Sequence, residues 1–171
     1  PLYDAREVFL FECYTGIRIS DILTLKWKHI TDEKISIRMR KTEKLLTIPI
    51  NDYVRSVLDR RRCAVENNGG KITSEKYVFN ILKVDVDEVS AQDALNAISS
   101  ATAVINKQLK KIAEQANIDK NLSTHCARHS YATALLTNNI PLPVIKEMLG
   151  HSDIKVTQIY AKVVDLSLIH I

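Results

Sequence analysis

The sequence of 171 residues contains little glycine, proline or cysteine, with four, four and three of each. Three cysteines are an odd number, and their positions lack the spacing of metal ligands, which argues against a disulfide framework and favours reduced thiols in a cytosolic compartment. Internal repeats, low-complexity tracts and proline-rich linkers are also missing, and Asn67–Gly70 is the only stretch that suggests a flexible loop. We therefore expect residues 1–171 to form a single domain.

The sequence also lacks a signal peptide and any uninterrupted apolar run near the roughly 20 residues of a membrane helix. We expect a soluble, cytoplasmic protein with no membrane partner. Lysine and arginine outnumber aspartate and glutamate by only 24 to 20, a net charge of +4. This small excess permits nucleic-acid binding without predicting it, while 46% apolar residues are enough to build a core.

Apolar residues recur at helical spacing in most segments and alternate with polar ones in only one, over residues 35–50. The sequence therefore predicts a mainly α-helical fold with a small antiparallel β-hairpin. Gly16 and Gly150 follow helical segments and can adopt the left-handed conformation that ends a helix. The expected helices are residues 4 to 14, a short one capped by Ser20, 51 to about 65, 101 to 116, one capped by Ser123 or Thr124, one starting at Pro141 and one capped by Ser152.

A histidine and an arginine stand three residues apart at the start of the helix that Ser123 or Thr124 caps. His125 and Arg128 therefore share one face of the first turn. The helix dipole also favours an anion at this end, and a phosphodiester is the anion that an imidazole beside a guanidinium suits best.

Two other segments carry residues of the same kind. Near the beginning, Thr15-Gly16-Ile17-Arg18-Ile19-Ser20-Asp21 presents Arg18 after a helix end, and near the other end Leu149-Gly150-His151 is followed nine residues later by Tyr160. Arg18, then His125 and Arg128 in a His-x-x-Arg motif, then His151 and Tyr160, together resemble the signature of the tyrosine recombinases, or phage integrases. The resemblance extends over nearly the whole chain.

The resemblance implies the tyrosine recombinase catalytic-domain fold, without the N-terminal DNA-clamping domain and the start of the catalytic domain. It implies that Arg18 and Arg128 bind the phosphate, that Tyr160 is the nucleophile and that His125 accepts its proton. His151 is expected to donate to the phosphate or to orient the site.

The family also carries a catalytic lysine on a β-hairpin, which protonates the departing 5′-oxygen. Lys41 fits that position best, and Lys44 is the alternative. Asp21 is expected to support Arg18 from behind. Because the arginines remain charged at physiological pH, no metal and no cofactor are required.

The implied activity is site-specific DNA recombination by a mobile-element integrase, through a 3′-phosphotyrosyl intermediate. The implied partners are double-stranded DNA, three further copies of the chain in a tetramer on DNA, and accessory DNA-bending proteins, with a monomer in the absence of DNA and a location in the bacterial cytoplasm. Three alternatives are weighed: a type IB topoisomerase, a non-catalytic DNA-binding helical module, and a metal nuclease that uses His125 and His129.

Four further expectations concern surfaces and packing. Arg55, Arg60, Arg61 and Arg62 are predicted to form a solvated helix face. Asp85, Asp87 and Glu88 are predicted to lie in a loop and the first turn of a helix, without chemistry of their own. Val156, Ile159 and Val163 are expected to point inward. The apolar tail 166–171 is expected to dock either on its own domain or on a neighbouring protomer.

Overall fold

The computed structural model describes the backbone of residues 2–168 and the side chains of residues 2–161. The chain is mainly helical with one two-stranded antiparallel sheet, which confirms the predicted fold class. Within the described part of the chain, no helix is long and apolar enough to cross a membrane. The elements are α1 (Leu2–Thr15), α2 (Ile19–Leu23), the 3-10 helix η1 (Trp27–His29), β1 (Lys34–Arg38), β2 (Leu45–Pro49), α3 (Asp52–Asn67), α4 (Ala91–Gln115), α5 (Thr124–Thr137), α6 (Leu142–Leu149) and α7 (Ile154–Leu168).

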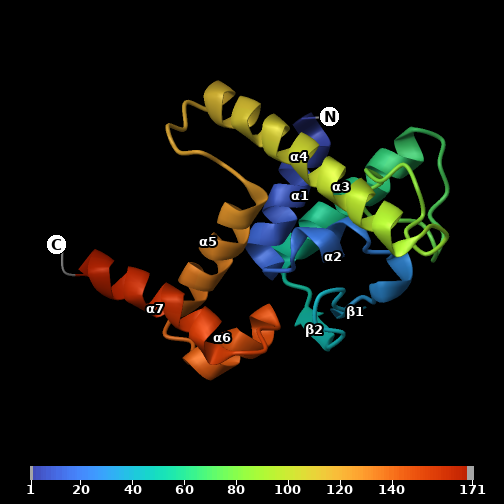
Figure 1. Cartoon of the computed structure of the whole chain (residues 1–171). Helices are drawn as coiled ribbons and strands as arrows, with labels where there is room; N and C mark the ends of the chain where they lie inside the picture. The colour runs from blue at the N-terminus through green and yellow to red at the C-terminus, as the bar shows by residue number, and fades with distance from the viewer. Residues whose placement is uncertain (1, 169–171) are drawn as a thin grey trace.

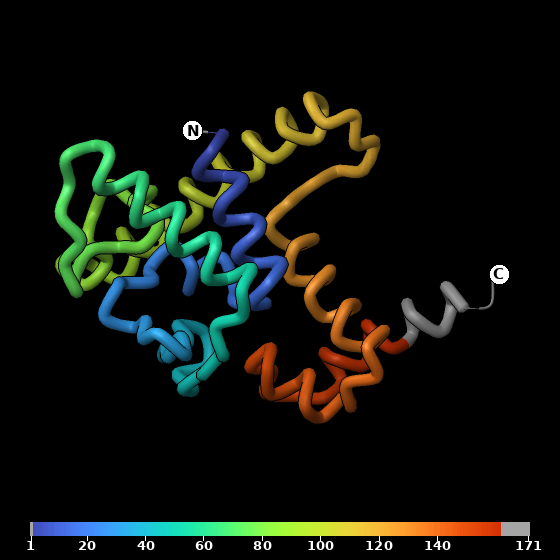
Figure 2. The backbone as a smooth tube through the Cα atoms, turned by 180° about the vertical axis from the view of Figure 1, so that it is seen from behind, coloured from blue at the N-terminus to red at the C-terminus, as the bar shows by residue number. Residues whose placement is uncertain are grey.

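Helix α1 lies at the centre of the molecule and packs against α3, α4 and α5 (Figures 1 and 2). Helix α5 leads from α1 to α6 and α7, which pack against one another at the end of the molecule where the hairpin also lies. The buried apolar residues form a large cluster from α1 to α4 and a small cluster on α5, α6 and α7. The small cluster consists of Tyr131, Ala132, Ile145, Leu149 and Tyr160.

The alternating segment folds as the predicted hairpin. Strands β1 and β2 pair in antiparallel register, with Ile35 opposite Ile48 and Ile37 opposite Leu46. All four side chains are buried, because alternate residues of a strand point to the same face and this face covers the large cluster. In the turn between the strands, residues 39–44, Met39 packs against Gly150 after α6, and Lys41 and Thr42 line the same cavity as residues of α7.

Helices α1 and α6 each end at a glycine. Gly16 after α1 and Gly150 after α6 have φ of 65° and 61°, the left-handed conformation that the sequence predicted. Asn51 and Ser123 cap α3 and α5 by accepting hydrogen bonds from the N–H groups of Val54 and Cys126, also as predicted.

The predicted caps Ser20 and Ser152 are wrong. Helix α2 has Arg18 as its N-cap, with no side-chain cap, and the carbonyl of Ser20 instead accepts a hydrogen bond from Thr24 Oγ1. At α7, Asp153 Oδ1 accepts the N–H of Lys155 at 2.9 Å, so the aspartate next to Ser152 satisfies the helix start. Both are errors of one or two residues, which side-chain chemistry alone does not resolve.

The arginine run on α3 is not uniformly solvated. Arg61 is only 6% exposed, contacts Asp4 Oδ1 at 2.6 Å and donates from Nε to the carbonyl of Val78. Its guanidinium also lies over the rings of Tyr3 and Phe79. Its burial was not predicted, because the partner that compensates its charge lies 57 positions earlier in the chain.

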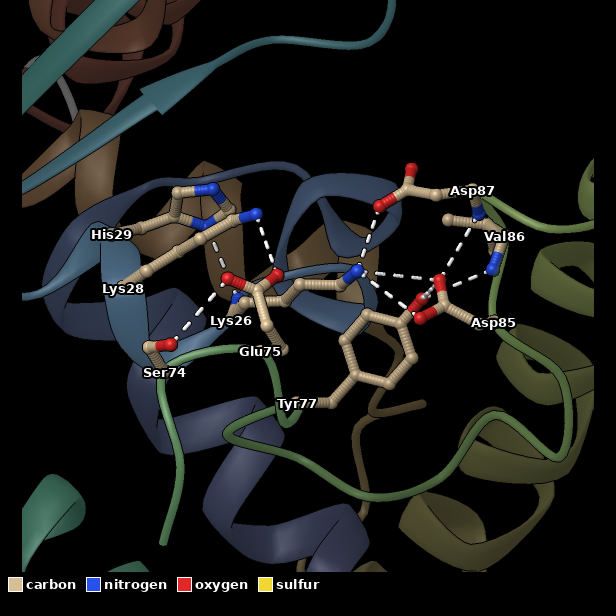
Figure 3. A network of polar contacts seen from close by, with 9 residues as sticks. All are labelled: Lys26, Lys28, His29, Ser74, Glu75, Tyr77, Asp85, Val86 and Asp87. Carbon is tan, nitrogen blue, oxygen red and sulfur yellow. Dashed lines mark hydrogen bonds and ion pairs between the residues drawn. The ribbon is translucent and has the colours of Figure 1, made fainter.

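The acidic cluster lies in a loop, as predicted, but not in the first turn of a helix, because α4 begins only at Ala91. Figure 3 shows the ammonium of Lys26 between two carboxylates of this cluster. Lys26 Nζ lies 3.1 Å from Asp85 Oδ2 and 2.7 Å from Asp87 Oδ2. Tyr77 Oη donates to Asp85 at 2.7 Å. These contacts fix the loop against the segment that follows α2.

The orientation of α7 differs from the prediction. Val156 and Ile159 are 46% and 59% exposed, whereas Thr157 and Tyr160 are buried. The helix is turned so that Thr157 meets His151 in a hydrogen bond. Val163 and the tail 166–171 lie outside the residues whose side chains are described.

Gly16 offers a test of how tightly the core surrounds the end of α1. A Cβ at this position would lie 2.2 Å from Tyr131 Cδ1, so Gly16→Ala adds a clash to the cost of a positive φ, and we expect a loss of about 2 to 4 kcal/mol in the free energy of unfolding. Gly69→Ala is the matched control: φ is 70° and no atom lies within 4 Å of the added Cβ, so about 1 kcal/mol is expected. Urea denaturation of both variants measures the difference, and equal losses would contradict the packing described here.

Candidate active site

One cavity of about 480 Å³ lies where the large and small clusters meet. Its walls come from α1, the start of α2, the hairpin turn, α5, the turn after α6, and α7. All six residues predicted to be catalytic line it: Arg18, Lys41, His125, Arg128, His151 and Tyr160. Side chains separated by as many as 142 positions in the sequence therefore reach one space.

Arg128 is the most buried of the cations in the cavity, at 6% exposed. Its Nη1 donates to the carbonyl of Gly16, and its Nη2 donates to the carbonyl of Leu149 at 2.6 Å. Nη2 also lies 3.0 Å from Nε2 of His151. Burial, together with the nearby charge of Arg18, lowers the pKa of Arg128 to about 10. The side chain is still a cation at neutral pH.

Arg18 approaches the same cavity from the turn after α1. Its Nη2 donates to the carbonyl of Gly150 at 3.3 Å, and its Nη1 lies 3.3 Å from Sδ of Met39 on the hairpin. Arg18 and Arg128 are close enough for each charge to act on the other. Two like charges held together in a partly buried cavity favour an anion between them.

His151 is held on both ring nitrogens. Nε2 faces the guanidinium of Arg128, which can only donate hydrogen bonds. Nε2 is therefore the acceptor, and the ring proton lies on Nδ1. Nδ1 then donates to Thr157 Oγ1 at 2.9 Å. Burial lowers the pKa of His151 to about 4, helped by the charges of Arg128, Arg18 and Lys41. His151 is therefore a neutral imidazole that positions Arg128.

Tyr160 lies on the buried side of α7 and is 7% exposed. Burial raises the pKa of its phenol above the ordinary value, although Arg128 and Arg18 act in the opposite direction. The phenol is therefore protonated at neutral pH, and a base is needed before its oxygen can act as a nucleophile.

His129 is a residue of the cavity that the sequence reasoning weighed only as a metal ligand. Its ring centroid lies 5.1 Å from that of Tyr160 and 4.3 Å from that of His125. Burial lowers the pKa of His129, so it is neutral at pH 7. Its place one helical turn after His125, on the same face of α5, is the signal that identifies it as part of the site.

The hairpin turn brings Lys41 rather than Lys44 into the cavity. Lys41 is exposed and lines the cavity, whereas Lys44 does not belong to its walls and uses its carbonyl to accept the N–H of Met39. Asp21 supports this turn, because its Oδ1 accepts the N–H of Arg40 at 2.9 Å. Asp21 was expected to support Arg18, and it acts on Arg18 only through its charge.

Glu12 was not predicted to belong to the site at all. It is 2% exposed and lines the cavity near Arg128. Burial raises the pKa of its carboxyl to about 9, more than Arg128 lowers it, so Glu12 is neutral at pH 7. The signal was present in the sequence, since Val8, Phe11, Glu12 and Thr15 follow the spacing of one buried helix face.

Among the residues that the structure describes, no three histidine, cysteine, aspartate or glutamate side chains are grouped to hold a metal ion. The one histidine pair of the cavity, His125 and His129, shares it with two guanidinium groups.

Solved structures with a similar fold include recombinases and integrases. The XerH recombinase bound to palindromic difH substrate in a post-cleavage complex aligns with a TM-score of 0.68 at 23% identity, over 96% of this chain and 43% of that chain. The XerA recombinase aligns with a TM-score of 0.63 at 21% identity, over 92% of this chain and 57% of that chain. The catalytic domain of bacteriophage HP1 integrase aligns with a TM-score of 0.54 at 25% identity, over 91% of this chain and 73% of that chain. The fold is that of a tyrosine recombinase catalytic domain.

Comparison of the amino-acid sequence assigns the chain to a family. Residues 3–166 match the phage integrase family, and the chain belongs to that family. It is 33% identical to the tyrosine recombinase XerD of Staphylococcus haemolyticus over 165 residues, which are 94% of this chain and 50% of that protein. It is 54% identical to the XerD of Halalkalibacterium halodurans over 57 residues, 33% of this chain and 19% of that protein. The chain thus spans half or less of each of these two relatives.

The neutral state of His151 is directly testable. The pKa of His151 is about 4 in the folded protein and about 6.5 in an unfolded chain. Between these two pH values the unfolded state binds more protons, so the free energy of unfolding decreases as the pH falls. We expect the stability advantage of the wild type over His151→Gln to fall by up to about 3 kcal/mol between roughly pH 7 and pH 4. Urea denaturation across this range, with NMR of the ring nitrogens, measures it. An imidazole that titrates near its ordinary pKa would contradict the arrangement.

Proposed function

We propose that this chain cleaves and rejoins DNA strands through a covalent bond to Tyr160, as the catalytic domain of a site-specific recombinase. The observation that carries the proposal is the meeting of two guanidinium groups and one tyrosine in a single cavity. A phosphodiester has one negative charge and gathers more on its non-bridging oxygens in the transition state, which two fixed cations stabilise. The family and the recombinase names of the relatives support the same assignment.

In the proposed reaction the oxygen of Tyr160 attacks the phosphorus and the bond from phosphorus to the 5′-oxygen breaks. The phenolic proton passes to His125, and Lys41 supplies a proton to the departing 5′-oxygen. The products are a 3′-phosphotyrosyl bond and a free 5′-hydroxyl. Attack by the 5′-hydroxyl of another strand reverses the steps and restores Tyr160, so the exchange needs no external energy source.

Arg18 and Arg128 supply the electrostatic part. Arg128 has five N–H donors, and the described residues account for three of them, which leaves two for a phosphate oxygen. His151 accepts from Arg128 and so keeps its plane fixed. In this proposal His151 acts by positioning Arg128, while direct donation to the phosphate would require it to leave that contact.

The partner in this proposal is double-stranded DNA. The structural relatives include a lambda integrase dimer bound to a core site and a Tn1549 integrase in complex with a circular intermediate DNA. We further propose that residues 1–171 work as the catalytic part of a longer protein, that strand exchange takes place in a tetramer assembled on DNA, and that the protein acts in the bacterial cytoplasm.

Tyr160→Phe tests the nucleophile. A duplex that carries the recombination site and a nick beside the cleavage position traps the covalent complex, because the short 5′-end diffuses away. We expect the wild type to form a protein–DNA adduct that peptide mapping places on Tyr160, and the variant to form none. Tyr131→Phe is the matched control, a buried tyrosine of the same small cluster that does not line the cavity, and should retain the adduct. EDTA should leave the yield unchanged. An adduct in the Tyr160 variant would refute the assignment.

A change of the leaving group in the DNA substrate tests whether Lys41 or Lys44 is the general acid. If Lys41 protonates the 5′-oxygen, Lys41→Ala should slow cleavage by about 100-fold or more, and a substrate with sulfur in place of the bridging 5′-oxygen should restore it, because a thiolate leaves without a proton. Lys44→Ala should cleave both substrates at the wild-type rate. Single-turnover rates on the two substrates measure this, and the reverse pattern would assign the role to Lys44.

A further inference from the structure

Glu12 is the one acidic side chain among the described residues that line the cavity. It sits on α1, on the buried face that packs against α5, and is 2% exposed. The mechanism proposed above gives it no part. Yet an acid in a cavity built for an anion has a large effect, since a carboxylate there would repel the phosphate and compete with it for the arginines.

The hydrogen bonding of Glu12 is incomplete. Its Oε2 is buried and has no hydrogen-bond partner among the described residues. A buried polar atom without a partner costs about 1 to 3 kcal/mol, which a ligand that hydrogen-bonds to it would recover. Asp21 also has one buried oxygen without a partner, Oδ2, but its Oδ1 accepts the N–H of Arg40 and its side chain does not line the cavity. Glu12 therefore has both an unmet hydrogen bond and a cavity that a ligand can enter.

The charges around Glu12 leave it neutral. From α5 it faces Arg128, which favours the carboxylate, and on α1 itself its neighbour is Cys13. Burial outweighs the attraction of Arg128 and raises the pKa of Glu12 to about 9. At neutral pH the side chain is a carboxylic acid, which has an O–H to donate.

The other helices that pack against α1 bring no compensating cation to Glu12, and the one charged residue of α2 is the acid Asp21. The α3 arginines Arg60 and Arg61 are paired with Glu7 and Asp4, one to two turns earlier on α1. The buried residues of α4 are all apolar. Arg18 reaches the same cavity from the turn after α1.

We propose that Glu12 is a further phosphate-binding residue of this site, which as a neutral acid donates its O–H to a non-bridging oxygen beside Arg128. The proposal rests on the proposed function in one respect, that the cavity takes a DNA phosphate. No proton is transferred in this contact. Above the pKa of Glu12 the carboxylate repels the phosphate and pairs with Arg128, so phosphate binding and the protonation of Glu12 are linked. Affinity is full below that pKa and falls as the pH rises through it.

Dimethyl phosphate is a suitable probe, because it is the smallest phosphodiester and keeps one negative charge over the whole range. With protein labelled with ¹³C at the glutamate carboxyls, NMR measures both the titration of Glu12 and the binding of the probe. Glu12→Gln keeps the shape and an N–H donor but cannot ionise, and its missing signal assigns Glu12. Glu12→Met keeps the length and has no donor. Circular dichroism verifies that both variants are folded.

We expect the affinity of the wild type for dimethyl phosphate to fall about tenfold from pH 8 to pH 10, and that of Glu12→Gln by at most about twofold, the share left to Arg128. At pH 7.5 Glu12→Gln should bind like the wild type and Glu12→Met about tenfold more weakly. The probe should raise the pKa of Glu12 in the wild type, a measurement that needs no variant to fold.

Three results would overturn the proposal: a Glu12 carboxyl that titrates near its ordinary pKa, an identical pH dependence in the wild type and Glu12→Gln, or no binding of the probe at saturating concentration. None of these depends on DNA cleavage or on Tyr160. A Tyr160 adduct together with any of them would leave the proposed function standing and remove only the role of Glu12.

Discussion

The guanidinium of Arg128 is the contact on which the rest of the site depends. It donates to the carbonyls of Gly16 and Leu149, which lie at the C-terminal ends of α1 and α6. These ends carry the negative pole of each helix, so two helix dipoles stabilise a cation that burial disfavours. The same guanidinium holds His151, which precedes α7. One buried charge therefore ties the first helix of the chain to the last two, and it fixes the cavity and the fold together.

The cavity brings the cations Arg18 and Arg128 together and keeps His151, Tyr160 and Glu12 neutral. Burial and the nearby cations keep the imidazole of His151 neutral, while burial keeps the proton on Tyr160 and on Glu12. Arg18 and Arg128 are then cations that repel one another. A phosphodiester that enters relieves this repulsion, and it meets donors that need no rearrangement. In the proposed function, this concentration of positive charge is what binds and activates such an unreactive group.

Much of this could be predicted from the sequence, where the signal is local. The glycines that end α1 and α6, the alternation that forms the hairpin and the signature residues from Arg18 to Tyr160 all depend on near neighbours or on a spaced motif. What was missed depends on distant partners. Arg61 is buried because Asp4 compensates it, and Val156 is exposed because Thr157 turns α7 toward His151. Glu12 has the spacing of a core residue and the chemistry of a surface residue, and only the tertiary fold decides between them.

The central claim is that two guanidinium groups and one phenol surround a single phosphorus. A crystal structure of the protein with cleaved target duplex and orthovanadate, which mimics the five-coordinate transition state, tests it most directly. The vanadium should lie in the cavity with the oxygen of Tyr160 as a ligand, and both Arg18 and Arg128 should be within hydrogen-bonding distance of its oxygens. Vanadate bound elsewhere, or held in the cavity without one of the two arginines, would contradict the claim.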